Sequence, residues 1–144
     1  MHAQRSGALR IDCRCDGGSV RIWAFGNRGV APVGAAEGHV HDRVLLLTCL
    51  FVKASHRGRG LGSALLCSAA RFCRASGVRR IELDDMTGRR SEANIYCKHG
   101  FRYDAGGGPE MHGRPRAVLA AAREKCHRVL PSRRSERLRF HGKK

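Results

Sequence analysis

Apolar and polar residues alternate in two short stretches near the N-terminus. "ALRIDCRC" (8–15) and "SVRIWAF" (19–25) place an apolar residue at nearly every second position, as a strand with one buried face requires. The "DGG" between them (16–18) has the composition of a tight turn. This part of the chain is therefore predicted to form a β-hairpin.

The next two segments differ sharply from each other. Residues 26–42, "GNRGVAPVGAAEGHVHD", are rich in glycine and alanine and contain a proline, and we expect a loop there. Residues 43–52, "RVLLLTCLFV", are almost continuously apolar. Such a run without alternation is typical of a central strand that is buried on both faces.

A helical pattern begins after three closely spaced glycines in "SHRGRGLGSALL" (55–66). Beyond these glycines, one helical face gathers Leu61, Ala64, Leu65, Ser68, Ala69, Phe72 and Cys73. Gly77 is a natural end for this helix, because glycine readily adopts the left-handed conformation that follows many helices.

Shorter elements follow along the chain. "RRIELDDM" (79–86) has the pattern of a strand, and "FRYDA" (101–105) that of another. Between them, "SEANIYCKHG" (91–100) predicts a short helix with Ser91 as its N-cap and Gly100 as its stop.

The pattern is weaker towards the C-terminus. No further strand is evident after Pro109, and "RAVLAAAREKCHRVL" (116–130) predicts a helix with a modest apolar stripe. The expected order is therefore β-β-β-α-β-α-β, followed by a helix.

Positive charge is the most unusual feature of the composition. The 144 residues, enough for one domain, carry a formal net charge of +16. Residues 114–144 hold 11 lysines and arginines against two acidic residues. We therefore divide the chain into a domain (1–113) and a basic C-terminal helix or tail (114–144). Such a tail either binds nucleic acid without specificity or is a disordered, solubilising end.

The seven cysteines indicate an intracellular protein, cytoplasmic or nuclear. Their number is odd, and several lie in apolar segments, as reduced and partly buried thiols do. No apolar run approaches the length of a membrane span, and the first residues lack the apolar core of a secretory signal. Cys13 and Cys15, with His39 and His41, offer four soft ligands, but C-x-C lacks the usual C-x-x-C spacing, so we expect no metal.

The glycine turn has the composition of a phosphate-binding site. The N-terminus of a helix leaves amide groups without partners and carries a partial positive charge, and glycines let a phosphate approach the backbone. The Walker loop is excluded because Ser63-Ala64 follows the last glycine. A dinucleotide-binding fingerprint stays open: Gly58 and Gly60 fit it, Ser63 replaces its third glycine, and Glu82 or Asp84 stands where its acidic residue is expected.

Two motifs in this order resemble the GCN5-related N-acetyltransferase (GNAT) family. "RGRGLG" (57–62) matches the family signature Q/R-x-x-G-x-G/A at every fixed position. "EANIYCKHGFRY" (92–103) is similar to the late helix and strand of the family, through Asn94, Tyr96, Gly100 and Phe101. The resemblance covers roughly residues 43–105. It implies an α/β (α+β) fold with a mixed, mostly antiparallel sheet flanked by helices, here with a shortened N-terminal region.

The resemblance also implies acetyl-coenzyme A as the cofactor. Its pyrophosphate would be held by the turn and the start of the helix: Arg57, Gly58, Arg59, Gly60, Leu61, Gly62 and Ser63. Its pantetheine arm would run along Leu50, Phe51 and Val52, where that strand splays from residues 79–86, and would bond to Asn94.

The implied reaction is acetyl transfer to a primary amine of a protein or small molecule. The neutral amine attacks the thioester, the amide of Val52 stabilises the developing oxyanion, and Tyr96 protonates the leaving thiolate. A primary amine must first lose a proton, since its unperturbed pKa is about 10.

The sequence departs from the family in three respects. The glutamate base that histone-modifying members carry on the central strand falls here on Leu46, which leaves Asp84, Asp85, His41 and His56 as candidate bases. The two helices that usually follow the first strand are missing, and no closing strand is evident. A polycationic acceptor would require Asp84, Asp85, Asp104 and Glu110 to gather into an acidic patch.

Two other functions stay open. A catalytically weak relative could act as a basic module that binds nucleic acid or an acidic partner, as the missing glutamate and helices would allow. A dinucleotide-binding oxidoreductase is the other alternative. The short N-terminal region, with its exposed sheet edges, also favours a homodimer.

Overall fold

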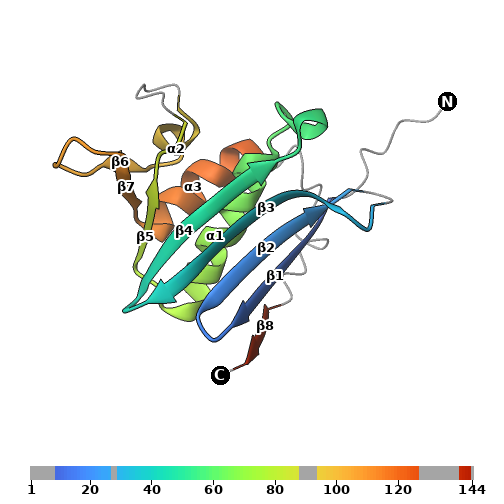
Figure 1. The fold of residues 1–144 in the computed structure, drawn as a ribbon, viewed down its shortest axis with the longest axis horizontal. Coiled ribbons are helices and arrows are strands. Elements are labelled where there is room, and N and C mark those ends of the chain that lie inside the picture. The colour runs from blue at the N-terminus through green and yellow to red at the C-terminus, as the bar shows by residue number, and fades with distance from the viewer. Residues whose placement is uncertain (1–8, 27–28, 88–93, 127–139, 144) are drawn as a thin grey trace.

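The computed structural model of the protein describes residues 9–26, 29–87, 94–126 and 140–143. They form a single eight-stranded sheet in the order β6-β7-β5-β4-β3-β2-β1-β8, together with four helical segments (Figure 1). The strands are β1 (Arg10–Asp16), β2 (Ser19–Phe25), β3 (Pro32–His41), β4 (Val44–Val52), β5 (Arg80–Asp84), β6 (Arg102–Tyr103), β7 (Glu110–Gly113) and β8 (Phe140–Lys143). The helical segments are η1 (Ala54–His56), α1 (Leu61–Ser76), α2 (Ile95–Lys98) and α3 (Pro115–Cys126).

The sheet is mixed and mostly antiparallel, which confirms the expected fold class. The pairs β4–β5 and β1–β8 are parallel, and the other neighbouring strands are antiparallel. β1 and β2 form the predicted hairpin. α1 ends at Gly77, whose φ of 73° is left-handed and whose amide donates to the carbonyl of Cys73, as predicted for a glycine stop.

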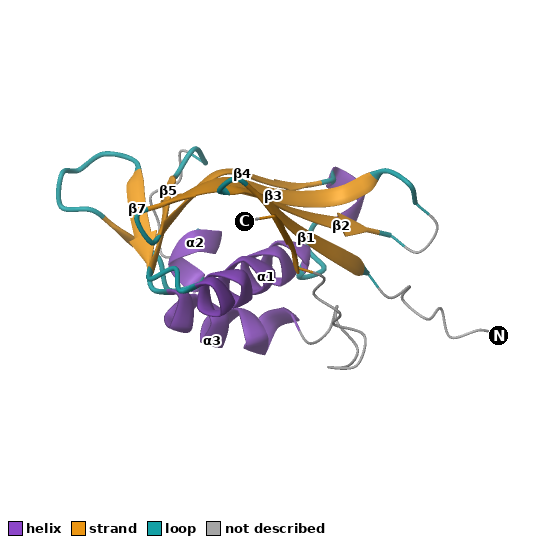
Figure 2. Cartoon of the chain, turned by 90° about the horizontal axis from the view of Figure 1, so that it is seen from below, coloured by secondary structure: helices purple, strands orange, loops and turns teal. Residues whose placement is uncertain are grey.

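The helices α1, α2 and α3 all lie on one side of the sheet (Figure 2). α1 lies between the sheet and α3, so residues 61–70 are all buried instead of one face alone. The core between these layers contains the fully buried Ile22, Leu45, Leu65, Ile81 and Val118. No helix in the described ranges is long and apolar enough to cross a membrane.

The loop expected over 26–42 is wrong, because most of it is strand β3. Small residues suit this strand where it crosses α1. A Cβ atom on Gly34 would lie 3.2 Å from the side chains of both Leu61 and Leu65. Close packing against the helix therefore outweighs the weak strand propensity of glycine and alanine.

The expectation that residues 43–52 are buried on both faces is also wrong. Leu45 and Leu47 are buried against the helices, whereas Leu46 and Phe51 are about half exposed (45 % and 47 %). In the described part of the chain no helix covers the second face of the sheet (Figure 2). The continuous apolar run therefore reflects one buried face and one partly apolar open face.

The C-terminal part contains more regular structure than expected. β7 follows Pro109 and pairs with both β5 and β6, so a closing strand does exist. α3 begins at Pro115, a residue suited to the first turn of a helix, and the division expected between residues 113 and 114 falls just before it. Val118, Leu119 and Ala122 of α3 belong to the same core. Residues 127–139 and 144 of the basic C-terminal segment, which include the end of the expected helix, and Ser91 lie outside the described residues.

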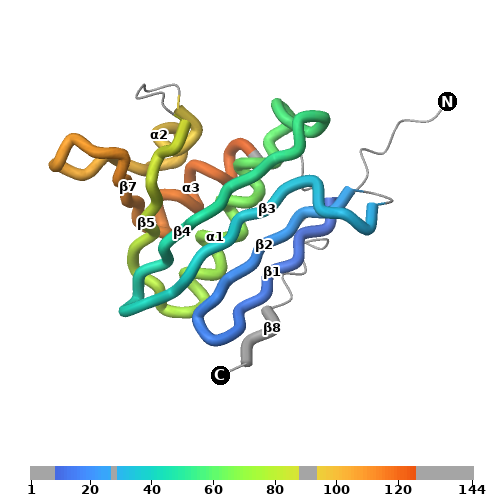
Figure 3. Tube along the Cα trace, in the orientation of Figure 1, coloured from blue at the N-terminus to red at the C-terminus, as the bar shows by residue number. Residues whose placement is uncertain are grey.

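A β-bulge in β4 separates this strand from β5. Gly38 pairs with Leu47 and Glu37 with Cys49, so Thr48 is an extra residue in β4. The ladder between β4 and β5 ends at the same place, with the pair Leu47–Leu83. Beyond it the two strands diverge (Figure 3), which is the splay that the family resemblance implies.

The bulge requires glycine at position 38. A Cβ atom there would lie 2.2 Å from the carbonyl oxygen of Leu46, which is backbone and cannot move aside alone. We expect Gly38→Ala to lower the free energy of unfolding by about 2 kcal/mol, and the melting temperature by roughly 6 °C. Gly106→Ala is the control, because a Cβ atom at Gly106 meets nothing within 4 Å. Equal melting temperatures of the two variants would contradict this account of the bulge.

Candidate active site

A cleft of about 580 Å³ opens where β4 leaves the sheet. Its lining comes from the end of β4, the turn before α1, the helix α2 and the end of α3. Nine of the residues expected at the site line it: Leu50, Val52, Arg57, Gly58, Gly60, Leu61, Gly62, Ser63 and Tyr96. Fold and sequence thus bring two motifs that are far apart in the chain to one cleft.

The turn before α1 presents amide groups to this cleft. Gly58 and Gly60 have φ values of 77° and 82°, in the left-handed region that favours glycine. The amide of Ala64 donates to the carbonyl of Gly60 at 3.0 Å and makes the first bond of the helix. The amides of residues 61–63 therefore have no intrahelical partner, and they lie at the positive end of the helix dipole.

The two arginines of the turn differ in position. The Arg57 amide donates to the carbonyl of Ala54 and its Nε donates to the carbonyl of Val52, at 3.3 and 3.1 Å. Arg57 therefore braces the turn while its side chain lines the cleft. Arg59 is exposed and does not line it, so its expected contact with the cofactor stays a prediction.

Sequence reasoning missed two cationic side chains of the cleft. Lys98, at the end of α2, and Lys125, near the end of α3, both line it. The ammonium group of Lys125 donates to the carbonyl of Lys98 at 3.0 Å. The two lysines are 27 residues apart in sequence. Only the fold brings both of them to the cleft beside the glycine turn.

The end of β4 presents backbone groups to the cleft. The Lys53 amide donates to the carbonyl of Val33 on the β3 side, at 2.8 Å. Because successive residues of a strand direct their backbone groups to opposite sides, Val52 directs its amide away from β3, towards the cleft. Phe51 does not line the cleft; its side chain lies on the open face of the sheet, half exposed.

Tyr96 stands on α2 with its ring partly buried. The ring packs edge to face on Phe101, with centroids 5.9 Å apart. Burial raises the pKa of the phenol, and the nearby Asp85 and Cys49 raise it further. The hydroxyl therefore keeps its proton at neutral pH and can donate it.

Asn94 has an internal role. It is 6 % exposed and caps α2, with its Oδ1 accepting from the Tyr96 amide at 2.7 Å. Its Nδ2 donates to Asp85 and Thr87, at 2.9 and 3.0 Å. Asn94 does not line the cleft, so its expected bond to the pantetheine arm stays a prediction, and its visible effect is to orient Tyr96.

Asp85 anchors α2 to the end of β5. Its carboxylate accepts from the amide and hydroxyl of Thr87, from Asn94 and from the hydroxyl of Tyr103. Burial acts to raise the pKa of this carboxyl, but the hydrogen bonds outweigh it and hold the pKa below its usual value. A buried carboxylate with these donors is a structural anchor, and it does not line the cleft as a base would.

A second buried polar pair joins α2 to α1. His99 is 2 % exposed, and its Nε2 lies 2.8 Å from the Oγ of Ser63. Its Nδ1 lies 2.6 Å from the carbonyl oxygen of Ile95. No sequence signal distinguished this histidine from the seven others.

A smaller cavity, of about 230 Å³, lies between the diverging strands. β4 and β5 supply most of its lining, including Thr48, Cys49 and Asp84. Leu50 and Tyr96 line both this cavity and the larger cleft. The two cavities therefore share Leu50 and Tyr96 as a common wall.

The candidate bases do not cluster. Asp84 lines the smaller cavity and His56 the cleft. His41, by contrast, is at the opposite end of β4, with its Nε2 3.2 Å from a carboxylate oxygen of Asp42. Leu46, in the position of the missing glutamate, faces the open side of the sheet.

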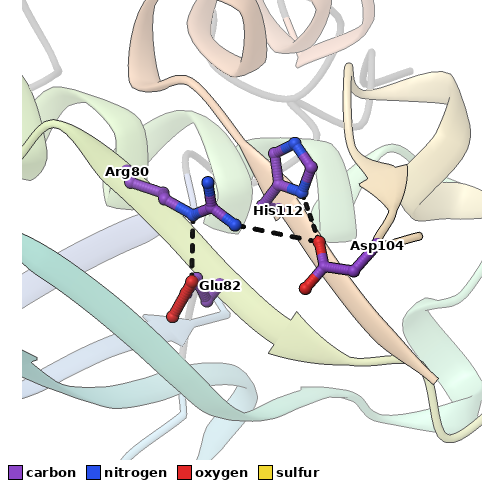
Figure 4. Close-up of polar contacts among 4 residues, drawn as sticks. All are labelled: Arg80, Glu82, Asp104 and His112. Carbon is purple, nitrogen blue, oxygen red and sulfur yellow. Dashed lines mark hydrogen bonds and ion pairs between the residues drawn. The ribbon is translucent and has the colours of Figure 1, made fainter. Parts of the chain in front are cut away.

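The four acidic residues considered as a patch, Asp84, Asp85, Asp104 and Glu110, do not form one, because two of them are engaged in other contacts. Asp84 and Glu110 are opposite each other in register and exposed. Asp104 instead bonds to His112 at 2.5 Å and lies 3.8 Å from Arg80 (Figure 4). With Asp85 buried, only Asp84 and Glu110 form an exposed acidic pair.

The cysteines and histidines considered as zinc ligands do not converge. No group of three or more potential ligands is found among the residues that the structure describes. Cys13 is fully buried, and burial raises its pKa to about 12. Six cysteines of the described ranges, Cys13 among them, have free thiols.

The anchoring role of Asp85 predicts a pH-dependent loss of stability. Because its pKa is lower in the folded than in the unfolded chain, its contribution is present above the unfolded pKa and is lost as the pH falls through the folded value. We expect Asp85→Asn to cost about 2 kcal/mol at pH 7 and much less below about pH 3. Urea unfolding at both pH values measures this, with Asp84→Asn as an exposed control. A penalty that is independent of pH would contradict this role for the charge.

Comparison with known proteins identifies the family to which this fold and cleft belong. The chain matches a model of the "Acetyltransferase (GNAT) family" over residues 3–101. It is similar in structure to the PaiA N-acetyltransferase of Thermoplasma acidophilum, solved in complex with coenzyme A (TM-score 0.59, 19 % identity). That alignment covers 67 % of this chain and 61 % of the other.

Two further structures are similar at comparable levels. GCN5 of Tetrahymena gives a TM-score of 0.57 at 16 % identity, with 69 % of each chain covered. Nourseothricin acetyltransferase gives 0.57 at 23 % identity, with 68 % of this chain and 66 % of the other covered. No curated protein matches the chain. Since the family model matches more than half of the residues, the chain belongs to the GNAT acetyltransferase family.

Proposed function

We propose that the protein transfers an acetyl group from acetyl-coenzyme A to a primary amine. The observation that carries this proposal is that Tyr96 lines both cavities. One cavity has the amides and cations that suit a phosphorylated donor. The other gives an acceptor a separate approach to the same phenol.

The larger cleft fits the cofactor in its chemistry. The amides of the glycine turn, the positive end of α1 and the side chains of Arg57, Lys98 and Lys125 suit a pyrophosphate. The edge of β4 beyond Leu47, where its ladder with β5 has ended, suits the amide groups of a pantetheine arm, which would pair with it as an added strand does. The cofactor supplies an activated acetyl thioester when bound.

The chain contributes a proton donor and an oxyanion donor. Tyr96 would give its phenolic proton to the leaving sulfur, and burial favours the protonated phenol that this requires. The amide of Val52, directed towards the cleft, would donate to the oxygen on which charge develops. Asn94 and Asp85 hold Tyr96 in place through the cap of α2.

The smaller cavity suits the acceptor. It opens between β4 and β5, away from the basic turn, and Asp84 is the carboxylate in its lining. An amine with a pKa of about 10 arrives protonated at neutral pH, so a carboxylate attracts it and can receive its proton directly or through water. The identity of the amine, whether in a protein or a small molecule, is not fixed by this lining.

Nothing in the comparisons or the described residues favours the two alternatives. The dinucleotide fingerprint still lacks its third glycine at Ser63. Nucleic-acid binding by the tail, a homodimer and an intracellular location stay predictions.

Charge at the glycine turn tests cofactor binding. Gly58 lines the cleft with φ of 77°, and a Cβ atom there meets nothing within 4 Å. Gly58→Asp and Gly58→Asn share shape and backbone strain but differ by one negative charge. We expect the aspartate variant to bind acetyl-coenzyme A about tenfold more weakly than the asparagine variant, or ~1.4 kcal/mol.

Calorimetric titration measures the two affinities. The difference should shrink at 1 M salt, where the Debye length falls to about 3 Å. Equal affinities of the two variants at low salt would show that no anion binds at this turn.

Loss of the phenol tests the proton donor. Tyr96→Phe keeps the ring that packs on Phe101 and removes the hydroxyl. We expect kcat with a panel of primary amines to fall about 100-fold, with the dissociation constant of acetyl-coenzyme A unchanged. Tyr103→Phe is the matched control, because it removes a hydroxyl that bonds to Asp85 and does not line the cleft. Unchanged kcat in Tyr96→Phe would rule out this role.

A further inference from the structure

The buried His99 connects the helix that bears Tyr96 to the first turn of α1. Its ring bonds through Nδ1 to the carbonyl of Ile95 and through Nε2 to the hydroxyl of Ser63. No step of the proposed reaction uses this ring. Ser63, however, lines the cleft beside the amides that suit a pyrophosphate.

The partners of the ring determine its tautomer. A carbonyl oxygen only accepts hydrogen bonds, so the Nδ1 of His99, 2.6 Å from the Ile95 oxygen, must carry a proton. In the neutral ring Nε2 is then an acceptor, and Ser63 must donate its hydroxyl to it over 2.8 Å. The single hydroxyl proton of Ser63 is therefore directed at the histidine, and only oxygen lone pairs are left for an anion in the cleft.

A second proton on the ring reverses this bond. The Nε2–H group of an imidazolium donates to the Oγ of Ser63. The hydroxyl proton of Ser63 can then turn towards the cleft and donate to a phosphate oxygen. The protonated ring also adds a positive charge directly behind the turn.

The surroundings of the ring oppose its protonation in the absence of an anion. Burial lowers the pKa of His99, the bond to Ile95 partly offsets this, and the charges of Lys125 on α3 and Lys98 on α2 lower it further. From the turn before α1, Arg57 and His56 face the same cleft. A bound phosphate changes this balance, because a negative charge nearby favours the charged form of histidine.

We propose that His99 takes up a proton from solvent when the phosphates of acetyl-coenzyme A bind, and that Ser63 then donates its hydroxyl to that anion. This inference rests on the proposed function. His99 is thus a positioning residue that acts through Ser63. The proton goes from water or buffer to Nε2, and no covalent bond is made or broken.

Proton uptake on binding is measured by calorimetric titration with coenzyme A in two buffers of different ionisation enthalpy, between pH 6 and 8. We expect wild type to take up a larger fraction of a proton than Ser63→Ala and His99→Gln do. The affinity of wild type should also fall more steeply with rising pH, by up to about tenfold per pH unit for one linked proton. Protonation of the ligand itself is the same in all proteins, so the difference between wild type and variant reports the pair.

His56→Gln is the matched control, because it removes the other histidine that lines the cleft. It should retain the part of the proton uptake that Ser63→Ala and His99→Gln lose. Uptake that is lost in His56→Gln and kept in His99→Gln would overturn the assignment. So would equal uptake in wild type, Ser63→Ala and His99→Gln.

A measurement on the wild-type protein covers the case in which a variant does not fold. The pKa of the His99 ring is followed by NMR with and without coenzyme A, and it should rise on binding. An unchanged pKa with coenzyme A bound overturns this inference and leaves the proposed function standing. Failure of wild type to bind coenzyme A at all overturns both.

Discussion

The separation of β4 from β5 after Leu47 is the constraint on which the rest of the site depends. Two strands that stayed paired would bury their backbone groups in the ladder and leave no cleft. Here the extra residue Thr48 bends β4 at the point where pairing ends, and Gly38 allows the backbone of β3 to approach closely enough to keep its own pairing with β4. The sheet thus remains continuous on one side of β4 and opens on the other.

This opening explains why the cleft and the smaller cavity share Leu50 and Tyr96 in their lining. The helix side of the gap receives the start of α1, with its amides and positive dipole end, and the basic side chains from α2 and α3. The other side contains the exposed edge of β5 with Asp84. Although the chain is positively charged, the smaller cavity, where an ammonium group would enter, is lined by the carboxylate of Asp84. The cations lie in the larger cleft, where a phosphate would bind.

The parts of the fold that could be predicted from sequence are those that local chemistry determines. Alternation at 8–15 and 19–25 determined the hairpin, and glycines determined both ends of α1. β3 was missed because its small residues reflect packing against α1, which is invisible before the fold is known. Likewise, β4 appeared doubly buried because an apolar run does not reveal that one face of the sheet has no helix over it.

The site divides in the same way. The glycine turn, the edge of β4 and Tyr96 lie in the segments that resemble the family, and the resemblance implied that they act together. Lys98, Lys125 and His99 follow no pattern along the chain, since each matters only through a contact with a distant segment. Asn94 caps its own helix through Oδ1 and donates through Nδ2 to Asp85 and Thr87, and its expected bond to the cofactor stays a prediction.

The position of Tyr96 is therefore a tertiary property. α2 has four residues, too few for a helix to be stable by itself. The start of α2 is held by the hydrogen bond between Asn94 and Asp85, and its end by the bond between His99 and Ser63. Its side is held by Ile95, which packs so closely on Gly62 that a Cβ atom there would lie 2.8 Å from the Ile95 Cδ1. Two of these three anchors contact Ser63 and Gly62 in the first turn of α1, which belongs to the site proposed for the pyrophosphate. A change there consequently reaches Tyr96 through direct contacts, so the proposed cofactor site and the proposed proton donor belong to one packed unit.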